Sequence, residues 1–249
     1  MLSAEYERMF ALENEHWWFV ARRSLTLQLL ERFGTAGGRL LDLGCGTGAV
    51  LQELTARGRA VGIDSSPLAL SLSRQRGLQG LIRGDAQAMP FRSESFDAVV
   101  SLDLFEHLPS DRAGIAEAFR VLRPGGILVL AVPAMESLWG PHDVALMHHR
   151  RYSRAEIVVL LKASGFGIRR ASYSLFFLYP LVRWVRLLER RRGGQPRSSL
   201  KPVPNRINRA LIALQRFEAA ILGRVDLPWG SSVVVVAERP ARRALPGSK

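Results

Sequence analysis

The stretch Arg39–Gly48, RLLDLGCGTG, decides the fold expected for this chain. Its leucines at 40, 41 and 43 predict a buried strand, and the glycines after them predict a tight turn into a helix from about Ala49. Glycines at 44, 46 and 48 let the backbone take positive φ and approach a ligand closely. The free N–H groups at the start of the helix suit a carboxylate or a phosphate. The stretch therefore predicts a ligand site where a strand meets a helix.

A second strand, Arg59–Asp64 (RAVGID), ends in a carboxylate 22 residues after Asp42. An α/β nucleotide site places an acid at this distance to accept ribose hydroxyls. Strand and helix patterns alternate from residue 39 to 133, which predicts a parallel sheet with helices on both faces. We expect strands near 39–43, 59–64, 80–84, 96–102, 126–132, 167–174 and 231–239.

Five segments occur in order along the chain: LDLGCGTG, VGIDSSP, GDAQAMPF, FDAVVSLDLFEHL and LRPGG. They resemble the ordered motifs of class I S-adenosylmethionine-dependent methyltransferases, and are closest to the group of ubiquinone and menaquinone biosynthesis methylases. The resemblance covers roughly residues 39–170. It implies an α/β fold with a doubly wound, mostly parallel, seven-stranded Rossmann-like sheet. It also implies S-adenosylmethionine as the cofactor, and it leaves the acceptor open.

The resemblance and side-chain chemistry together imply a cofactor site. Asp42 would bind the ammonium of the methionine part, Asp64 would accept both ribose hydroxyls, and Asp85 would accept the adenine amine. Trp18 and Arg22 are expected in a lid, with Arg22 able to reach the methionine carboxylate. For Cys45, the only cysteine, packing within the turn is favoured over nucleophilic chemistry. The expected cofactor-binding residues are Asp42, Gly44, Cys45, Gly46, Gly48, Asp64, Ser65, Asp85, Ala86, Leu102, Asp103, Trp18 and Arg22.

Transfer to an oxygen acceptor also requires a base, and histidine suits neutral pH. His107 follows the fourth predicted strand, and the polar segment 142–152 follows the fifth. A role of that segment in acceptor binding competes with a structural histidine pair, and the sequence does not choose between its last two histidines. The expected catalytic residues are His148, His149, His107 and Tyr152.

A divalent metal is a weaker alternative for the same segment. His142, Asp143 and either His148 or His149 offer three ligands of suitable type. Such residues are more often structural or solvated, and we expect no metal.

The chain divides into a Rossmann-like domain and added helical parts. Helical spacing in residues 3–33 predicts a lid before the first strand. About 55 residues separate the sixth and seventh strands, far more than a hairpin needs. The expected units are an N-terminal helical lid at 1–38, a cofactor-binding domain at 39–174 with 231–239, a helical cap at 175–230 and a disordered tail at 240–249.

Charge is unevenly placed along the chain, whose net charge is +13. Residues 183–216 hold ten Lys and Arg against one Glu. This favours an anionic partner, and residues 175–192 could meet the inner face of a membrane. A solvated basic cap is the competing interpretation. The N-terminus shows no signal peptide pattern and no apolar run is long enough to span a bilayer, so we expect a cytoplasmic protein.

Three functions remain open at this point. The favoured one is methyl transfer to a small-molecule or lipid-linked acceptor, with oxygen as the methylated atom. An RNA methyltransferase would explain the charge, but we find no RNA-binding module and disfavour nucleic acid as a partner. A non-catalytic, membrane-docked protein that binds the cofactor is the third. The sequence does not indicate the oligomeric state.

Overall fold

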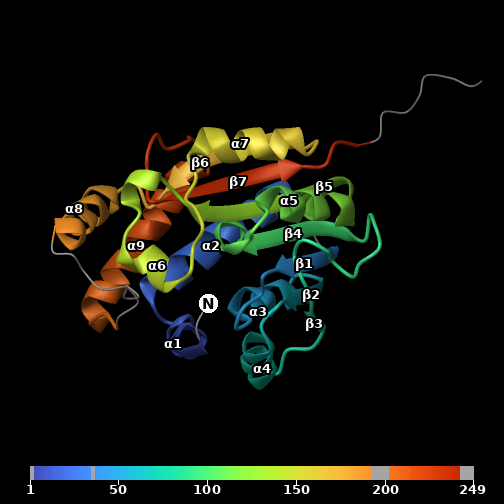
Figure 1. Ribbon diagram of the computed structural model, residues 1–249, viewed down its shortest axis with the longest axis horizontal. Helices are drawn as coiled ribbons and strands as arrows, with labels where there is room; N and C mark the ends of the chain where they lie inside the picture. The colour runs from blue at the N-terminus through green and yellow to red at the C-terminus, as the bar shows by residue number, and fades with distance from the viewer. Residues whose placement is uncertain (1–2, 35–36, 192–201, 242–249) are drawn as a thin grey trace, which may run out of the picture.

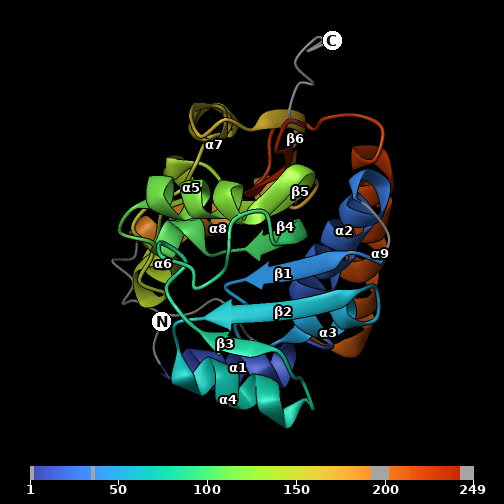
Figure 2. The ribbon, with the colours of Figure 1, turned by 90° about the vertical axis from the view of Figure 1, so that its right-hand side faces the viewer.

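A seven-stranded sheet forms the centre of the computed structural model, which describes residues 3–34, 37–191 and 202–241. The strand order is β3-β2-β1-β4-β5-β7-β6, with β7 antiparallel to both of its neighbours. The first five strands of this order are parallel and can be followed in Figure 2. This arrangement confirms the predicted fold class. The strands are β1 (Arg39–Leu43), β2 (Arg59–Asp64), β3 (Leu81–Arg83), β4 (Phe96–Leu102), β5 (Leu122–Pro133), β6 (Gly167–Ser174) and β7 (Ser232–Glu238).

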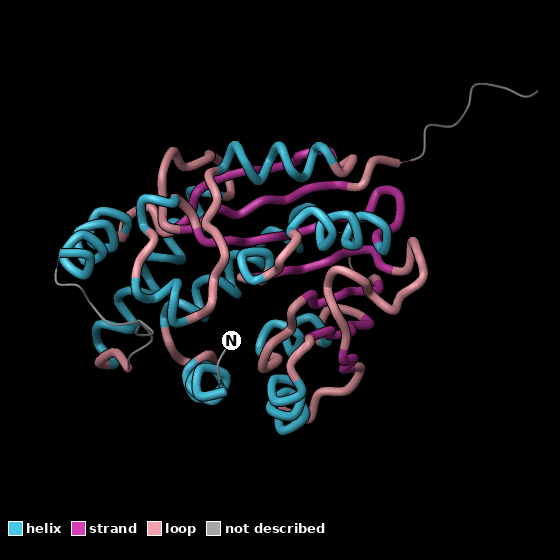
Figure 3. Tube along the Cα trace, in the orientation of Figure 1, coloured by secondary structure: helices cyan, strands magenta, loops and turns pink. Residues whose placement is uncertain are grey.

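Helices cover both faces of the sheet. In Figure 2, α2 and α9 lie on one side and α5 and α7 on the other, and Figures 1 and 3 show the strands between these layers. Each side buries its own apolar cluster. The helices are α1 (Ser3–Leu12), α2 (Trp17–Phe33), α3 (Ala49–Thr55), α4 (Pro67–Gln75), α5 (Asp111–Val121), α6 (Pro141–Ala145), α7 (Arg154–Ala163), α8 (Tyr179–Arg191) and α9 (Asn205–Leu222), with short 3-10 turns at Phe105–His107 and Glu136–Leu138.

Local chemistry explains several of these boundaries. Ser153 accepts a hydrogen bond from the Glu156 amide and the Glu156 carboxylate accepts one from the Ser153 amide, so the predicted capping box starts α7. β5 begins at Leu122, four residues before the predicted start at 126, because Leu122 already pairs with Phe96 of β4. Gly125, at φ +82°, then lets the strand continue through an irregular register.

The inserted helix α9 braces the N-terminal helices. Asn208 accepts from the Trp17 amide at 2.8 Å and donates to the Glu15 carbonyl at 2.8 Å. The helical spacing of residues 205–224 predicts an inward stripe through Ile207 that continues at either Phe217 or Glu218. Ile207 and Phe217 are exposed, whereas Glu218 is buried. Glu218 can be buried because it accepts from the Phe177 amide at 3.2 Å.

Within the described residues, none of the helices combines the length and apolarity that crossing a membrane requires. Most of the predicted disordered tail, from residue 242 onward, lies outside the described part of the chain. The same holds for the segment 192–201 between α8 and α9.

Candidate methyl-transfer site

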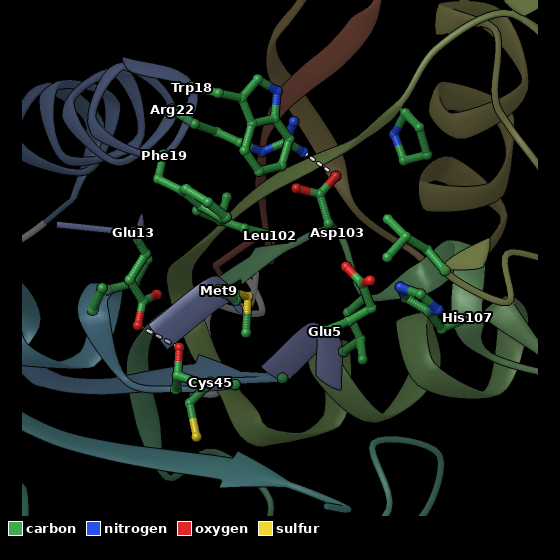
Figure 4. Close-up of a pocket in the computed structure, with 18 of the residues that line it drawn as sticks. Glu5, Met9, Glu13, Trp18, Phe19, Arg22, Cys45, Leu102, Asp103 and His107 are labelled. Atoms are coloured by element: carbon green, nitrogen blue, oxygen red, sulfur yellow. Dashed lines mark hydrogen bonds and ion pairs between the residues drawn. The ribbon is translucent and has the colours of Figure 1, made fainter. Parts of the chain in front are cut away.

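A cavity of about 510 Å³ opens at the carboxyl ends of β1, β2 and β4. The strand order reverses between β1 and β4, so the loops after these two strands diverge and leave room for a ligand. Helices α1 and α2 cover the opening with Met9, Trp18 and Phe19, among others (Figure 4). The cavity has a carboxylate-rich side at the glycine turn and a histidine-rich side beside residues 142–151. We call these the cofactor half and the acceptor half.

The glycine turn lines the cofactor half with its backbone. Gly44 and Gly46 have φ of +78° and +53°, which side chains other than glycine adopt at a cost. The amides of Gly44 and Cys45 donate to the Ile63 carbonyl at 2.9 and 3.0 Å, which ties the turn to β2. Gly48 also has positive φ, but it starts α3 and does not line the cavity. The Cys45 thiol is buried and burial raises its pKa, which agrees with a packing role.

Asp64 is held at the end of β2 by backbone donors. Its carboxylate accepts from the Gly46 amide at 2.9 Å and from the Ser66 amide at 2.8 Å. Burial raises the pKa of Asp64, while these amides act against that rise. Each carboxylate oxygen retains further acceptor capacity, which suits a pair of ribose hydroxyls.

Asp42 is buried in the floor of the cavity, and its Oδ2 has no hydrogen-bond partner among the described groups. Burial, followed by the charges of Asp64 and Glu13, raises the pKa of Asp42 to about 8. An unpaired buried carboxylate is costly, and a bound ammonium group would relieve that cost. This oxygen therefore fits the amino group of a methionine-like ligand.

The remaining predicted cofactor residues lie around the same half. Ser65, Asp85, Ala86 and Leu102 all line the cavity. Asp85 is exposed and also accepts from the Gln87 amide at 2.8 Å, so it supports its own turn as well as facing the cavity. The sequence predicted that these residues lie together because each is at or just after the end of a strand.

Glu13 attaches the N-terminal lid to the glycine turn. It hydrogen-bonds the Thr47 hydroxyl and pairs at 2.5 Å with Arg76, which directly follows α4. Arg76 in turn donates to the Thr47 carbonyl at 2.7 Å and lies 4.4 Å over the Phe10 ring. The sequence does not predict this connection, because nothing in the spacing of Glu13 and Arg76 indicates that they meet.

Trp18 and Arg22 line the cavity from α2, as predicted, but Arg22 already has a carboxylate partner. Its guanidinium lies 5.0 Å over the Trp18 ring, forms an ion pair with Asp103 and donates to the Ser232 hydroxyl at 3.0 Å (Figure 4). Asp103 follows β4 at the boundary of the two halves. The ion pair fixes α2 over that boundary, and the methionine carboxylate would have to share Arg22 with Asp103.

The acceptor half contains a histidine oriented by an acid. His148 Nδ1 lies 2.9 Å from Asp143 Oδ1, which also accepts from Arg151 Nε at 2.8 Å. The second oxygen of Asp143 accepts from the Gly140 amide at 2.9 Å. The hydrogen bond with His148 and the Arg151 charge hold the pKa of Asp143 below its usual range, against the effect of burial. A carboxylate on Nδ1 places the proton there and leaves His148 Nε2 as an acceptor.

His148 Nε2 faces a buried acid. It lies 4.0 Å from Glu106 Oε1, and neither oxygen of Glu106 has a hydrogen-bond partner among the described groups. Burial and the nearby Asp103 charge raise the pKa of Glu106 well above its usual range. Glu106, His107 and His148 bring possible ligand atoms within 4.8 Å of one another. The metal alternative considered from the sequence used Asp143 as a ligand. In the structure, the Asp143 carboxylate is already engaged by three donors.

Two of the four predicted catalytic side chains do not line the cavity. Tyr152 is buried in the core, where its hydroxyl donates to Asp111 at 3.1 Å, because its backbone forms a parallel bridge with Ala134 just after β5. His149 is exposed on the loop. His107 and His148 do line the cavity, with ring centroids 4.7 Å apart, and burial lowers the pKa of His107 to about 3. The geometry thus separates His148 from His149.

Comparison with known proteins agrees with this geometry. Residues 41–130 match a family described as a methyltransferase domain. These residues therefore form a methyltransferase domain, and the chain spans about 60% of the length of the two curated relatives described next. It is 33% identical over 162 residues to a probable S-adenosylmethionine-dependent methyltransferase of Mycolicibacterium smegmatis, covering 63% of this chain and 62% of the relative. It is 31% identical over 144 residues to a ubiquinone biosynthesis O-methyltransferase of Xanthomonas oryzae, covering 51% of this chain and 60% of that relative.

A solved structure shows the same fold over nearly the whole chain. It is described as an S-adenosylmethionine-dependent methyltransferase, possible histamine N-methyltransferase, from Thermotoga maritima, with a TM-score of 0.62 and 21% identity over 95% of both chains. The cofactor of this domain is S-adenosylmethionine. The residues present fit it, because Asp42 offers a buried unpartnered oxygen, the glycine turn offers close backbone approach and Asp64 offers acceptors for the ribose.

Proposed function

We propose that this protein transfers a methyl group from S-adenosylmethionine to an oxygen of a small-molecule or lipid-linked acceptor. The observation that carries the proposal is the Asp143–His148 pair in the acceptor half, with His148 lining the cavity beside the end of β4. A base is needed for a hydroxyl acceptor and is not needed for an amine that is already uncharged. The ubiquinone O-methyltransferase relative supports oxygen as the methylated atom.

When bound, S-adenosylmethionine supplies a methyl group already activated on a sulfonium. The residues of this chain must align the acceptor, exclude water and remove one proton. Asp64, Asp42 and the glycine turn would hold the cofactor. His148 Nε2 would accept the proton from the acceptor hydroxyl as the oxygen–methyl bond forms and the sulfur–methyl bond breaks, which leaves S-adenosylhomocysteine, and Asp143 would stabilise the imidazolium. The proton leaves to solvent when the cavity opens.

Helix α8 supports a membrane-associated, lipid-linked acceptor. Leu181, Trp184, Val185 and Leu187 are all exposed on it, with Trp184 at 59%, and exposed Arg183 lies among them. Aromatic and aliphatic side chains beside arginine suit the interface of an anionic membrane. Val182 of the same helix lines the cavity, so an acceptor could pass from the interface to the site.

Liposome co-sedimentation tests the membrane part of the proposal. The protein should sediment with anionic vesicles and not with neutral ones, less so as salt rises. Trp184→Ser should reduce sedimentation, whereas Val159→Ser on α7, where Val159 is 63% exposed, should not. Equal recovery in the supernatant with both vesicle types at low salt would leave α8 as a solvated cap.

Labelling of a fractionated cell extract tests the proposed reaction. Methyl-labelled S-adenosylmethionine should place label in the lipid or small-molecule fraction, and the label should survive conditions that hydrolyse RNA. Label in bulk RNA would favour the RNA methyltransferase alternative. Cofactor binding without label in any fraction would favour the non-catalytic alternative.

A further inference from the structure

Among the described side chains of helix α8, one charged group is buried. Arg186 is 8% exposed and lines the acceptor half, whereas Arg183, one turn earlier, is exposed, as are Trp184 and Leu187. Arginine is almost never buried unless it is paired. Its position inside the cavity therefore requires an explanation that the general amphipathic character of α8 does not supply.

The partner of Arg186 compensates its charge only in part. Arg186 donates to Glu189 Oε2 at 2.8 Å, and the Glu189 side chain is 35% exposed to water. Arg22, at the boundary of the two halves, and Arg151 also line the cavity, but they pair with the more deeply buried Asp103 and Asp143, whose side chains are 26% and 0% exposed. A half-solvated carboxylate on the same helix screens a guanidinium weakly.

The surroundings of Arg186 fix its position. A Cβ added at Gly140 would lie 3.3 Å from Arg186 Cδ, so this glycine leaves room for the arginine stem. The Arg186 charge, after burial, lowers the pKa of His142 to about 3, which keeps the neighbouring imidazole uncharged. Leu146 and Val182 supply apolar walls in the same half. A fixed cation thus stands beside neutral and apolar groups.

We infer that Arg186 binds an anionic oxyacid group, a carboxylate or a phosphate, carried by the methyl acceptor. A guanidinium presents five donors in a planar fork that matches such a group, and one bond to Glu189 leaves others for it. The acceptor is then an amphiphile with an apolar body, a hydroxyl for His148 and an anionic group under α8. This inference rests on the proposed function for the identity of the ligand as the acceptor.

Binding of matched probes tests the inference without any turnover. Protein saturated with S-adenosylhomocysteine is titrated calorimetrically with hexyl phosphate, hexan-1-ol and inorganic phosphate. Arg186→Gln should weaken hexyl phosphate at least about tenfold, because it removes a charge-assisted bond, and should leave hexan-1-ol unchanged. Arg183→Gln, on the same helix, should leave both unchanged. Glu189→Gln should strengthen hexyl phosphate binding, because it removes the competing carboxylate.

Several outcomes would overturn the inference. One is equal affinity of the wild type and Arg186→Gln for hexyl phosphate, and another is an equal loss in Arg183→Gln. Inorganic phosphate binding as tightly as hexyl phosphate would assign the site to a free anion. Arg186→Lys, which keeps the charge, should retain most of the affinity and so separates loss of charge from loss of folding. These titrations measure no methyl transfer, so a negative result would not contradict the proposed reaction. A negative result in the extract labelling would likewise not contradict the measured binding of hexyl phosphate.

Discussion

The two halves of the cavity are built in different ways. The cofactor half consists of residues at or next to the carboxyl ends of neighbouring parallel strands, such as Asp42, Asp64 and Asp85. The acceptor half takes Glu5 from α1, His148 from the loop after β5 and Arg186 from the insertion. Strand ends repeat one geometry, so the first half is fixed by the sheet. The second half depends on how separate helices and loops happen to meet, and this is where substrate specificity can vary on one scaffold.

The largest expected effect belongs to His148 in the acceptor half. His148→Ala should lower turnover by about 10²–10⁴-fold through loss of the base, while affinity for S-adenosylmethionine stays unchanged. Steady-state turnover on the labelled acceptor and calorimetry measure the two quantities. The matched control is His149→Ala, since His149 is exposed outside the cavity. Full turnover in His148→Ala would move the search for a base to His107.

Asp64 should produce the largest effect in the cofactor half. Asp64→Ala should weaken S-adenosylmethionine by at least about tenfold, since a charge-assisted hydrogen bond contributes roughly 1.5–3 kcal/mol. Calorimetric titration measures this directly. Asp226→Ala serves as the control, because Asp226 pairs with Arg170 outside the cavity. Unchanged affinity, or tighter binding of NADH than of the methyl donor, would contradict the assignment of this half.

Asp143 should have a smaller effect, since it acts through His148. Asp143→Asn should lower turnover by about tenfold or more with little change in KM, because the amide cannot stabilise an imidazolium. A positioning role also predicts that raising the pH restores part of the rate, which a purely structural role would not do. The thermal midpoint controls for the lost contacts to Gly140 and Arg151. A KM effect alone would contradict the assignment.

Asp42 should give the smallest effect, a pH dependence of cofactor binding. Its pKa in the free protein is about 8, so at pH 7 it is mostly protonated. Binding of an ammonium group favours the carboxylate and should release close to one proton. Calorimetry in two buffers of different ionisation enthalpy measures this release at pH 7, and Asp42→Asn should abolish it. Identical proton counts in wild type and Asp42→Asn would contradict the proposed contact.

The raised pKa of Asp42 also makes the stability of the free protein depend on pH. The folded pKa of Asp42 lies above the unfolded value of about 3.9, so the folded state holds a proton that the unfolded state loses. This contribution to the free energy of unfolding is complete below pH ~4 and is lost as the pH rises through about 8. Asp42→Asn should therefore flatten the decline with pH in the free protein.

The sequence predicted the cofactor half of the cavity better than the acceptor half. The glycine turn, Asp64 and most strand bounds were predictable, because each depends on residues close in the chain. His148 could not be separated from His149, since only the tertiary contact with Asp143 distinguishes them. The sequence did not single out Arg186, because apolar residues and arginines are interleaved along α8. In the structure, Gly140 leaves room for the Arg186 stem, and this explains why the side chain turns inward. The sequence prediction for Tyr152 was wrong because the bridge between its backbone and Ala134 directs the ring to the core.

A crystal structure with S-adenosylhomocysteine tests the division of the cavity most directly. We predict that both ribose hydroxyls bond to Asp64, that the amino group contacts Asp42 Oδ2, and that the sulfur faces the His148 side of Asp103. In that arrangement the transferred methyl group would point into the acceptor half. A nucleoside lying beside His142 and Arg186, with Asp64 making no contact to the ribose, would contradict the account.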